Sequence, residues 1–171
     1  WIDSAAAIAM NDTQIFVIGS QQSLLWNTIG IYDIESDTWS YPVGSVTPYK
    51  IHDPALGVLD NGNILITGGL KETTKGSGYT HNESTFIYNK NDETITQVGN
   101  NPIASLLQEA EPVPERNRDK KHYWTFNGAD GKHLILTTNP LFNSPPGLHL
   151  GSQTVIAALF DSTTNNYDLL I

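Results

Sequence analysis

Short runs of apolar, β-favouring residues recur along the chain, bounded by polar or glycine-containing segments. Three of these runs resemble one another, at residues 15–18, 64–67 and 134–137. The segment before each run carries Asn-Asp, Asn-Gly or Asp-Gly, and such residues suit tight hairpin turns because they tolerate positive φ. A further apolar stretch lies upstream of each turn, at residues 5–10, 54–59 and 124–129. The pattern predicts two antiparallel strands per unit, repeated three times.

The downstream half of each unit repeats as well. An aromatic residue is followed seven positions later by another large apolar residue, in the pairs Tyr32 and Trp39, Tyr88 and Ile95, and Phe160 and Tyr167. Polar, turn-forming residues separate the two members of each pair, as at the tip of a hairpin. Each unit is therefore predicted to be a meander of four short strands. The units span about residues 1–41, 50–99 and 121–171, and a long connection covers 100–122.

Four-stranded units repeated along a chain are typical of β-propellers, in which each unit forms one blade. The chain resembles the kelch-repeat family in particular. The resemblance rests on Gly68-Gly69, on Tyr32-Asp33 with Trp39, and on the histidines that lie twelve residues before two of the repeated strands, His52 and His122. It implies an all-β fold of kelch-type blades, three in this chain. We expect Trp39 and Tyr167 to be buried between blades.

The resemblance has departures. The glycine pair is replaced by Gly19-Ser20 in the first unit and by Thr138-Asn139 in the third, and Ile95 stands where a kelch tryptophan is expected. Three blades are also fewer than the four to eight of a closed propeller, and an open arc would expose two apolar faces. We therefore expect the chain to be part of a longer protein or, alternatively, to close a ring with other chains.

The long connection contains one candidate helix. Residues 103–110 have a helix-forming composition, and the prolines at 112 and 114 would stop it. The basic run at 116–121 follows several glutamates and is interpreted as a solvated loop.

Composition and charge exclude several functions. The net charge is −9 with nine Lys and Arg, which argues against nucleic-acid binding because phosphates require clustered basic residues. No apolar stretch is long enough to span a membrane. The chain has no cysteine, so neither disulfides nor thiol chemistry operate in it.

Two N-glycosylation sequons favour a secreted or cell-surface glycoprotein, with a cytoplasmic location as the alternative. They are Asn11-Asp12-Thr13, in a predicted turn, and Asn82-Glu83-Ser84, in a predicted long loop. We expect both asparagines to be exposed, because glycosylated sequons lie in surface loops. The scarcity of lysine and the abundance of Asn, Ser and Thr agree with this location.

The long connections are the predicted binding surface. In kelch propellers, the loop after the glycine-bearing strand and the crossover between blades emerge on one face, which here would join residues 20–28, 42–52, 70–84, 100–122 and 139–153. Long polar loops on a rigid scaffold commonly carry binding sites. The candidate ligand-binding residues are Trp26, Tyr49, Lys71, Lys75, Tyr79, His81, Phe142 and His149.

The sequence contains no recognisable catalytic constellation. Hydrolase, phosphate-loop and zinc-protease motifs are absent, and the scattered aspartates are interpreted as turn formers. His52 and His122 are interpreted as structural rather than as metal ligands, so no catalytic, cofactor or metal site is predicted. Copper-radical oxidases are built on similar propellers, but their cofactor joins a cysteine to a tyrosine, and this chain has no cysteine.

The predicted function is a non-catalytic propeller module that binds a protein or a glycan through its long-loop face. Its partners would be a protein or further blades that complete the propeller. The alternative is a scaffold segment of a carbohydrate-active or copper-radical oxidase-type enzyme whose catalytic residues lie outside these 171 residues.

Overall fold

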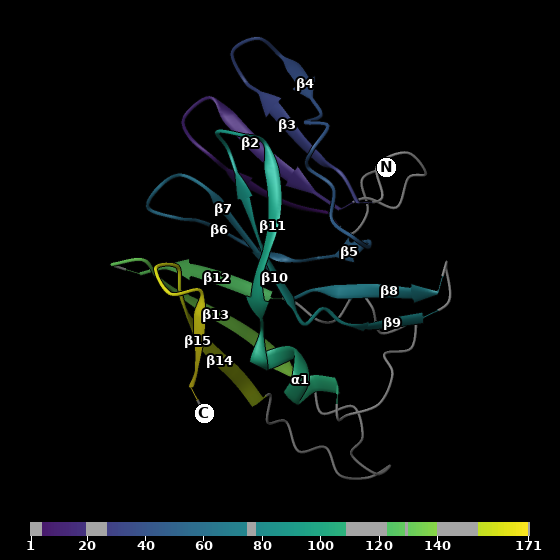
Figure 1. Ribbon diagram of the computed structural model, residues 1–171, viewed down its shortest axis with the longest axis vertical. Coiled ribbons are helices and arrows are strands. Elements are labelled where there is room, and N and C mark those ends of the chain that lie inside the picture. The colour runs from purple at the N-terminus through teal and green to yellow at the C-terminus, as the bar shows by residue number, and fades with distance from the viewer. Residues whose placement is uncertain are drawn as a thin grey trace.

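Nearly all regular structure in the described part of the chain is β-strand (Figure 1). The computed structural model describes residues 5–19, 27–74, 78–108, 123–128, 130–139 and 154–170. Its strands form four antiparallel sheets, three of four strands and one of three. The all-β class predicted from the sequence is confirmed.

Three of the sheets are four-stranded meanders, one for each unit. In the second unit, two strands of the small sheet are inserted between the second and third strands of the meander. The first sheet contains β1 (Ala6–Ala9), β2 (Gln14–Ile18), β3 (Ile29–Asp33) and β4 (Thr38–Ser40). The second contains β6 (Ala55–Val58), β7 (Ile64–Thr67), β10 (Ser84–Asn89) and β11 (Thr94–Asn100). The third contains β12 (Tyr123–Asn127), β13 (Lys132–Asn139), β14 (Thr154–Asp161) and β15 (Asn166–Leu170). The small sheet, inserted into the second unit, contains β5 (Ile51–His52), β8 (Leu70–Thr74) and β9 (Gly78–His81).

The outer hairpins of the three large sheets share one geometry. The predicted seven-residue pairs are directly opposed across the ladder: Tyr32 with Trp39, Tyr88 with Ile95, and Phe160 with Tyr167. In each hairpin the residue two positions before the second partner has positive φ, namely Asp37, Glu93 and Asn165. The polar residue after each aromatic accepts a backbone N–H inside the turn through its side-chain oxygen, at Asp33, Asn89 and Asp161. The repeat is therefore confirmed in its backbone geometry, and these polar residues form turns as interpreted.

The register of the third unit differs by one residue from the sequence alignment. Tyr32 pairs with Ile15 and Tyr88 with Ile64, whereas Phe160 pairs with His133. His133 is thus the structural equivalent of the two isoleucines, and the alignment of Leu134 with them is wrong. The reason is that apolar residues occupy both faces of β13, so hydrophobicity alone cannot fix the register of a strand whose side chains alternate.

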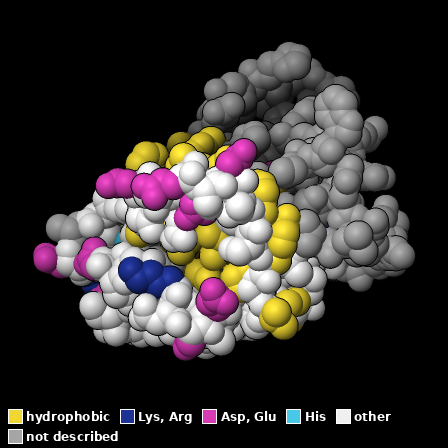
Figure 2. All heavy atoms as spheres, turned by 90° about the horizontal axis from the view of Figure 1, so that it is seen from above, with side chains coloured by type: hydrophobic (Ala, Val, Ile, Leu, Met, Phe, Trp, Pro, Cys, Tyr) yellow, Lys and Arg dark blue, Asp and Glu magenta, His cyan; other side chains and the backbone are white. Residues whose placement is uncertain are grey.

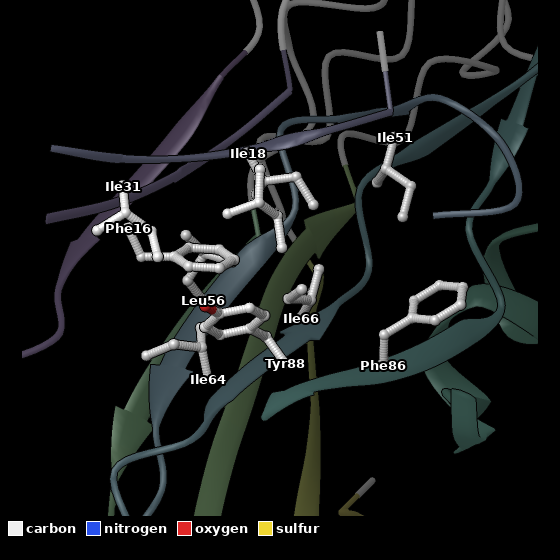
Figure 3. Close-up of a cluster of buried hydrophobic side chains, with 10 residues drawn as sticks. Phe16, Ile18, Ile31, Ile51, Leu56, Ile64, Ile66, Phe86 and Tyr88 are labelled. Carbon is white, nitrogen blue, oxygen red and sulfur yellow. The ribbon is translucent and has the colours of Figure 1, made fainter. Parts of the chain in front are cut away.

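The second sheet lies between the other two (Figure 1). One hydrophobic cluster joins its Leu56, Ile64, Ile66, Phe86 and Tyr88 to residues of the first sheet (Figure 3). Within that cluster the rings of Phe16 and Tyr88 lie 5.2 Å apart. A second cluster joins the opposite face of the second sheet to the third, through Ala55, Leu65, Ile135, Ala158 and Phe160. The first strands also meet, because β6 contacts both β1 and β12.

A polar cluster ties the second and third sheets together inside this second contact. The Tyr167 hydroxyl lies 2.9 Å from the Thr67 hydroxyl and 2.6 Å from that of Thr85. Asn101 donates an amide hydrogen to Thr67 at 3.1 Å. Burial raises the pKa of the Tyr167 phenol to about 12. Tyr167 therefore lies between two sheets, as predicted, although it is only partly buried. It remains protonated there at neutral pH.

Trp39 is not buried, contrary to the prediction. Its side chain is 44% exposed, stacked on Tyr41 and tilted against Tyr32. The register is nevertheless as predicted, because Trp39 pairs with Tyr32. The difference lies in the neighbouring sheet: the equivalent pairs of the second and third sheets face the sheet before them, and no described sheet stands in front of the first.

The predicted helix is present as α1, residues Pro102–Gln108. Asn101 caps it, since its side-chain oxygen accepts the N–H of Ile103 at 3.0 Å. Pro102 occupies the first helical position, where its missing N–H costs nothing. No helix among the described residues has the length and apolar character required to cross a membrane.

Candidate binding surface at the small sheet

The small sheet begins at the glycine pair that ends β7. Gly68 and Gly69 both have positive φ, 66° and 78°, so the chain turns sharply out of the second sheet and into β8. A Cβ atom on Gly68 would lie 2.4 Å from the ring of Tyr123, and one on Gly69 would lie 2.3 Å from the carbonyl oxygen of His52. The glycines therefore serve both the turn and the close approach of β5 and β12.

The small sheet projects from the second sheet on the side away from the β6–β7, β12–β13 and β14–β15 turns (Figure 1). β8 pairs with β9 on one edge and with β5 on the other. This hydrogen bonding means that the segment predicted as a polar loop is largely strand. Lys50, which precedes β5, and Glu72 of β8 form an ion pair in which Nζ and Oε2 lie 3.5 Å apart.

Tyr79 and His81 are buried, and their predicted place on the ligand-binding surface is wrong. Tyr79 packs with Leu70 in a small apolar cluster of their own, and its ring meets the His52 ring edge to face, with the centroids 5.0 Å apart. His81 Nδ1 lies 3.0 Å from the Tyr123 hydroxyl. These side chains form the base that fixes the small sheet to the second and third sheets, which agrees with the structural interpretation of His52.

Asn82 is completely buried, so the expectation that its sequon is exposed is wrong. Its amide nitrogen donates to the carbonyl oxygens of Gly68 at 2.9 Å and Ser84 at 3.0 Å. Its oxygen accepts the Tyr49 hydroxyl at 2.8 Å and the Ser84 N–H at 3.2 Å. The polar character of the side chain satisfies the backbone around the glycine pair instead of meeting solvent.

Asn11 is exposed, as predicted. Its side-chain oxygen accepts the backbone N–H groups of Thr13 and Gln14, at 2.9 and 2.8 Å, and so shapes the β1–β2 turn. The amide nitrogen donates to the side-chain oxygen of Gln14 at 3.1 Å. Of the two sequons, the first is the one whose asparagine this fold presents at the surface.

Two of the predicted ligand-binding residues meet at the surface of the small sheet. The Lys71 ammonium lies 4.9 Å from the centre of the Tyr49 ring, within the range of a cation–π interaction. The Tyr49 hydroxyl donates a hydrogen bond to the buried Asn82 side chain, which fixes the position of the ring. Both Tyr49 and Lys71 are partly exposed. The remaining candidates, Trp26, Lys75, Phe142 and His149, lie outside the described residues, as does His122.

The described residues contain no group of three or more His, Asp or Glu side chains that could hold a metal ion. Sequence reasoning missed two residues that organise this region, Asn82 as the centre of a hydrogen-bond network and Asn101 as both helix cap and partner of Thr67. Each asparagine lies just outside a strand, where the backbone lacks the hydrogen bonds of a sheet. Asparagine side chains commonly form hydrogen bonds to the backbone at such positions.

His133 is a titratable side chain at a place in the repeat that isoleucine occupies in the other two sheets. It is buried against the second sheet, with Nδ1 3.2 Å from the Asn127 side-chain oxygen and Nε2 lacking a hydrogen-bond partner among the described residues. Burial lowers the pKa of the His133 imidazole below its ordinary value, and the negative charge of Asp60 opposes part of this effect.

The lowered pKa of His133 predicts a loss of stability on acidification. The unfolded chain binds a proton at His133 as pH falls below about 6.5, before the folded chain does, so the free energy of unfolding decreases from that pH downward. Replacing His133 with isoleucine, the residue at the equivalent positions, should remove this part of the pH dependence. Urea unfolding of both proteins on either side of pH 6.5 measures it. An unchanged pH dependence in His133→Ile would contradict the assignment.

Comparison with known proteins places the chain by its fold alone. No protein-family model and no curated protein sequence matches it. Among solved structures, that of YjhT is similar, with a TM-score of 0.63 and 16% sequence identity. The similarity covers 99% of this chain and 52% of YjhT, so the chain spans about half the length of that protein. At this level of identity the likeness supports an all-β fold of the same kind and carries no residue roles.

Proposed function

We propose that the chain is a non-catalytic module of a kelch-like β-propeller that binds a protein or a glycan at its loop end. The observation that carries the proposal is the small sheet, where Lys71 meets Tyr49 on one face while His52, Tyr79 and His81 bury the opposite face. A rigid base lowers the entropy cost of ordering the contact residues when a ligand binds.

The propeller arrangement is supported by how the three large sheets pack. They stack face to face, each is a meander, and β6 at the start of the second sheet contacts the first strands of the other two. First strands that converge while fourth strands point outward are the geometry of blades around an axis. In this proposal further four-stranded sheets complete the ring.

The ligand class follows from the chemistry of the exposed residues. An aromatic ring beside an ammonium group offers an apolar face and a hydrogen-bond donor together, a combination that suits the mixed surface of a sugar or a peptide. We place the module in a secreted or cell-surface glycoprotein, with Asn11 as the glycosylated position.

The test is a comparison of two lysine substitutions. Lys71→Glu removes the cation at Tyr49, whereas Lys90→Glu makes the same change in the exposed β10–β11 turn. Each purified protein is applied to an array of immobilised glycans and to a display library of extracellular protein domains. We expect a ligand whose affinity falls about tenfold or more in Lys71→Glu and stays unchanged in Lys90→Glu. Equal affinity of the two variants, or no ligand in either collection, would contradict the proposed site.

A further inference from the structure

The second sequon places a modification signal inside the hydrogen-bond network that anchors the small sheet. Asn82 is followed by Glu83 and Ser84, so the tripeptide meets the sequence requirement for N-glycosylation. In the folded chain Glu83 and Ser84 are partly exposed, whereas Asn82 is completely buried. The nitrogen atom that would receive a glycan is therefore enclosed by the part of the fold that it supports.

Both hydrogens of the Asn82 amide nitrogen point at backbone carbonyl oxygens. Nδ2 lies 2.9 Å from the oxygen of Gly68 and 3.0 Å from that of Ser84. A glycan replaces one of these hydrogens with C1 of a sugar, at a bond length of about 1.45 Å. That carbon would lie only about 1.5 Å from the oxygen that the hydrogen faced, less than half of a normal contact distance. Neither direction has room for a sugar.

Reorienting Asn82 gives no exit either. Its side-chain oxygen accepts the Tyr49 hydroxyl at 2.8 Å and the Ser84 N–H at 3.2 Å, so exchanging its oxygen and nitrogen would set acceptor against acceptor. Its backbone N–H donates to the Gly69 carbonyl oxygen at 2.9 Å. The residue therefore cannot swing outward unless β9 separates from the glycine pair, and a glycan on Asn82 requires the small sheet to open.

The first sequon stands in contrast. Asn11 is exposed in the β1–β2 turn, and its amide nitrogen donates to the side chain of Gln14, which is itself partly exposed. The first sheet, to which this turn belongs, forms the end of the molecule seen in Figure 2, where hydrophobic, acidic and other side chains lie side by side. A glycan at Asn11 displaces no buried group.

We propose that N-glycosylation of Asn82 and folding exclude each other, so that folded molecules carry a glycan at Asn11 alone. In the secretory pathway the donor is a lipid-linked oligosaccharide diphosphate, and transfer takes place while the chain is being made. The bond from the sugar C1 to the diphosphate oxygen breaks, a bond from C1 to Nδ2 forms, and the amide loses one proton. At Asn82 this transfer competes with closure of the hydrogen-bond network.

The competition takes place early, because the partners of Asn82 lie close to it in the sequence. Gly68 and Tyr49 precede it by 14 and 33 residues, and Ser84 follows it by two. Hairpins form in about 1–10 μs, whereas chains lengthen by about 5–20 residues per second. The network can therefore close before the third unit has been made, and a glycan at Asn82 marks chains in which it has not closed.

Substitutions of Ser84 test the proposal, because they change the sequon and leave Asn82 in place. Ser84→Ala removes the sequon, and Ser84→Thr strengthens it, since the transferase uses Asn-X-Thr more efficiently than Asn-X-Ser. Both keep the backbone N–H and carbonyl group that bond to Asn82. The 171-residue chain is fused to a signal peptide and expressed in animal cells. Glycopeptides of the secreted and the retained protein are then identified by mass spectrometry.

We expect a glycan at Asn11 in the secreted wild type and in both variants, and a glycan at Asn82 only in retained chains that protease digests readily. The secreted yield should fall by about threefold or more from Ser84→Ala to Ser84→Thr. The same three proteins made in bacteria without glycans are the matched control. They should unfold at the same urea concentration, which assigns the difference in yield to the glycan.

A glycan at Asn82 on secreted, protease-resistant protein would overturn the proposal. So would equal secreted yields of Ser84→Ala and Ser84→Thr, or a Ser84→Thr chain without a glycan at Asn82 in either fraction. The inference rests on the secreted location proposed above, but the experiment supplies the secretory pathway itself. Lys71→Glu should show the wild-type glycan pattern, so failure of the ligand site and failure of this inference are distinguishable.

Discussion

Gly69→Ala is expected to lower the free energy of unfolding by about 2–4 kcal/mol, because alanine meets two penalties at this position. The residue has φ of 78°, in the left-handed region that is unfavourable for a side chain with a Cβ atom. The added methyl group would also lie 2.3 Å from the His52 carbonyl oxygen and 3.0 Å from the backbone of Pro54. Both neighbours are backbone atoms, so the strain is relieved only by moving β5 away from β8.

The control for this prediction is Gly57→Ala. Gly57 is also buried in the second sheet, but a Cβ atom there meets its nearest neighbours at 3.6 Å, an ordinary contact distance. Alanine should be neutral or stabilising by up to about 1 kcal/mol, since glycine weakens a strand interior. Urea unfolding of the two variants beside the wild type measures both effects. Equal stability of Gly69→Ala and Gly57→Ala would show that the turn at the glycine pair carries no strain.

The features that the sequence predicted correctly are those set by local chemistry. Positive φ in the Asn-Gly and Asp-Gly turns, and a turn closed by the side chain of Asp33, Asn89 or Asp161, depend on neighbours within a few positions. The spacing of Tyr32 and Trp39 likewise follows from one hairpin. The outer hairpin repeats in every unit, so three copies in one chain make it visible.

The errors concern contacts between units. The prediction for Trp39 was correct for its partner across the hairpin, Tyr32, and wrong for its burial. Burial depends on a neighbouring sheet, which the hairpin sequence does not specify. The sequence alignment equates Leu134 with Ile15 and Ile64, where the structure has His133, because apolar residues occupy both faces of β13. Only the position of the second sheet decides which face of the third becomes the core.

Of the described residues predicted to lie at the ligand-binding surface, two are partly exposed and two are buried. Lys71 and Tyr49 meet at the surface, whereas Tyr79 and His81 point into the base of the small sheet. A run of polar and aromatic residues after a glycine pair is typical of an exposed loop. It forms paired strands here because β5 supplies a third strand, and β5 precedes the glycine pair in the sequence by more than ten residues.

Asn82→Ala is the second substitution expected to have a large effect, lowering the free energy of unfolding by about 2–4 kcal/mol. The side chain makes four hydrogen bonds in a site without solvent contact, two donated to the carbonyl oxygens of Gly68 and Ser84 and two accepted from Tyr49 and the Ser84 N–H. Alanine removes the amide group that all four of these groups share as their hydrogen-bond partner. The Gly68 carbonyl oxygen then remains buried without a donor. The free-energy cost of such a buried group is larger than the contribution of an exposed hydrogen bond to stability.

The other sequon asparagine provides the matched control. Asn11 also bonds to the backbone of its turn, through the N–H groups of Thr13 and Gln14, but water replaces those bonds when the exposed side chain is truncated. Asn11→Ala should therefore cost at most about 1 kcal/mol. Thermal and urea unfolding of both variants give the comparison. If Asn82→Ala were as stable as Asn11→Ala, the Asn82 network would not hold the small sheet in place, and Tyr49 and Lys71 would lack the rigid base on which the proposed binding surface depends.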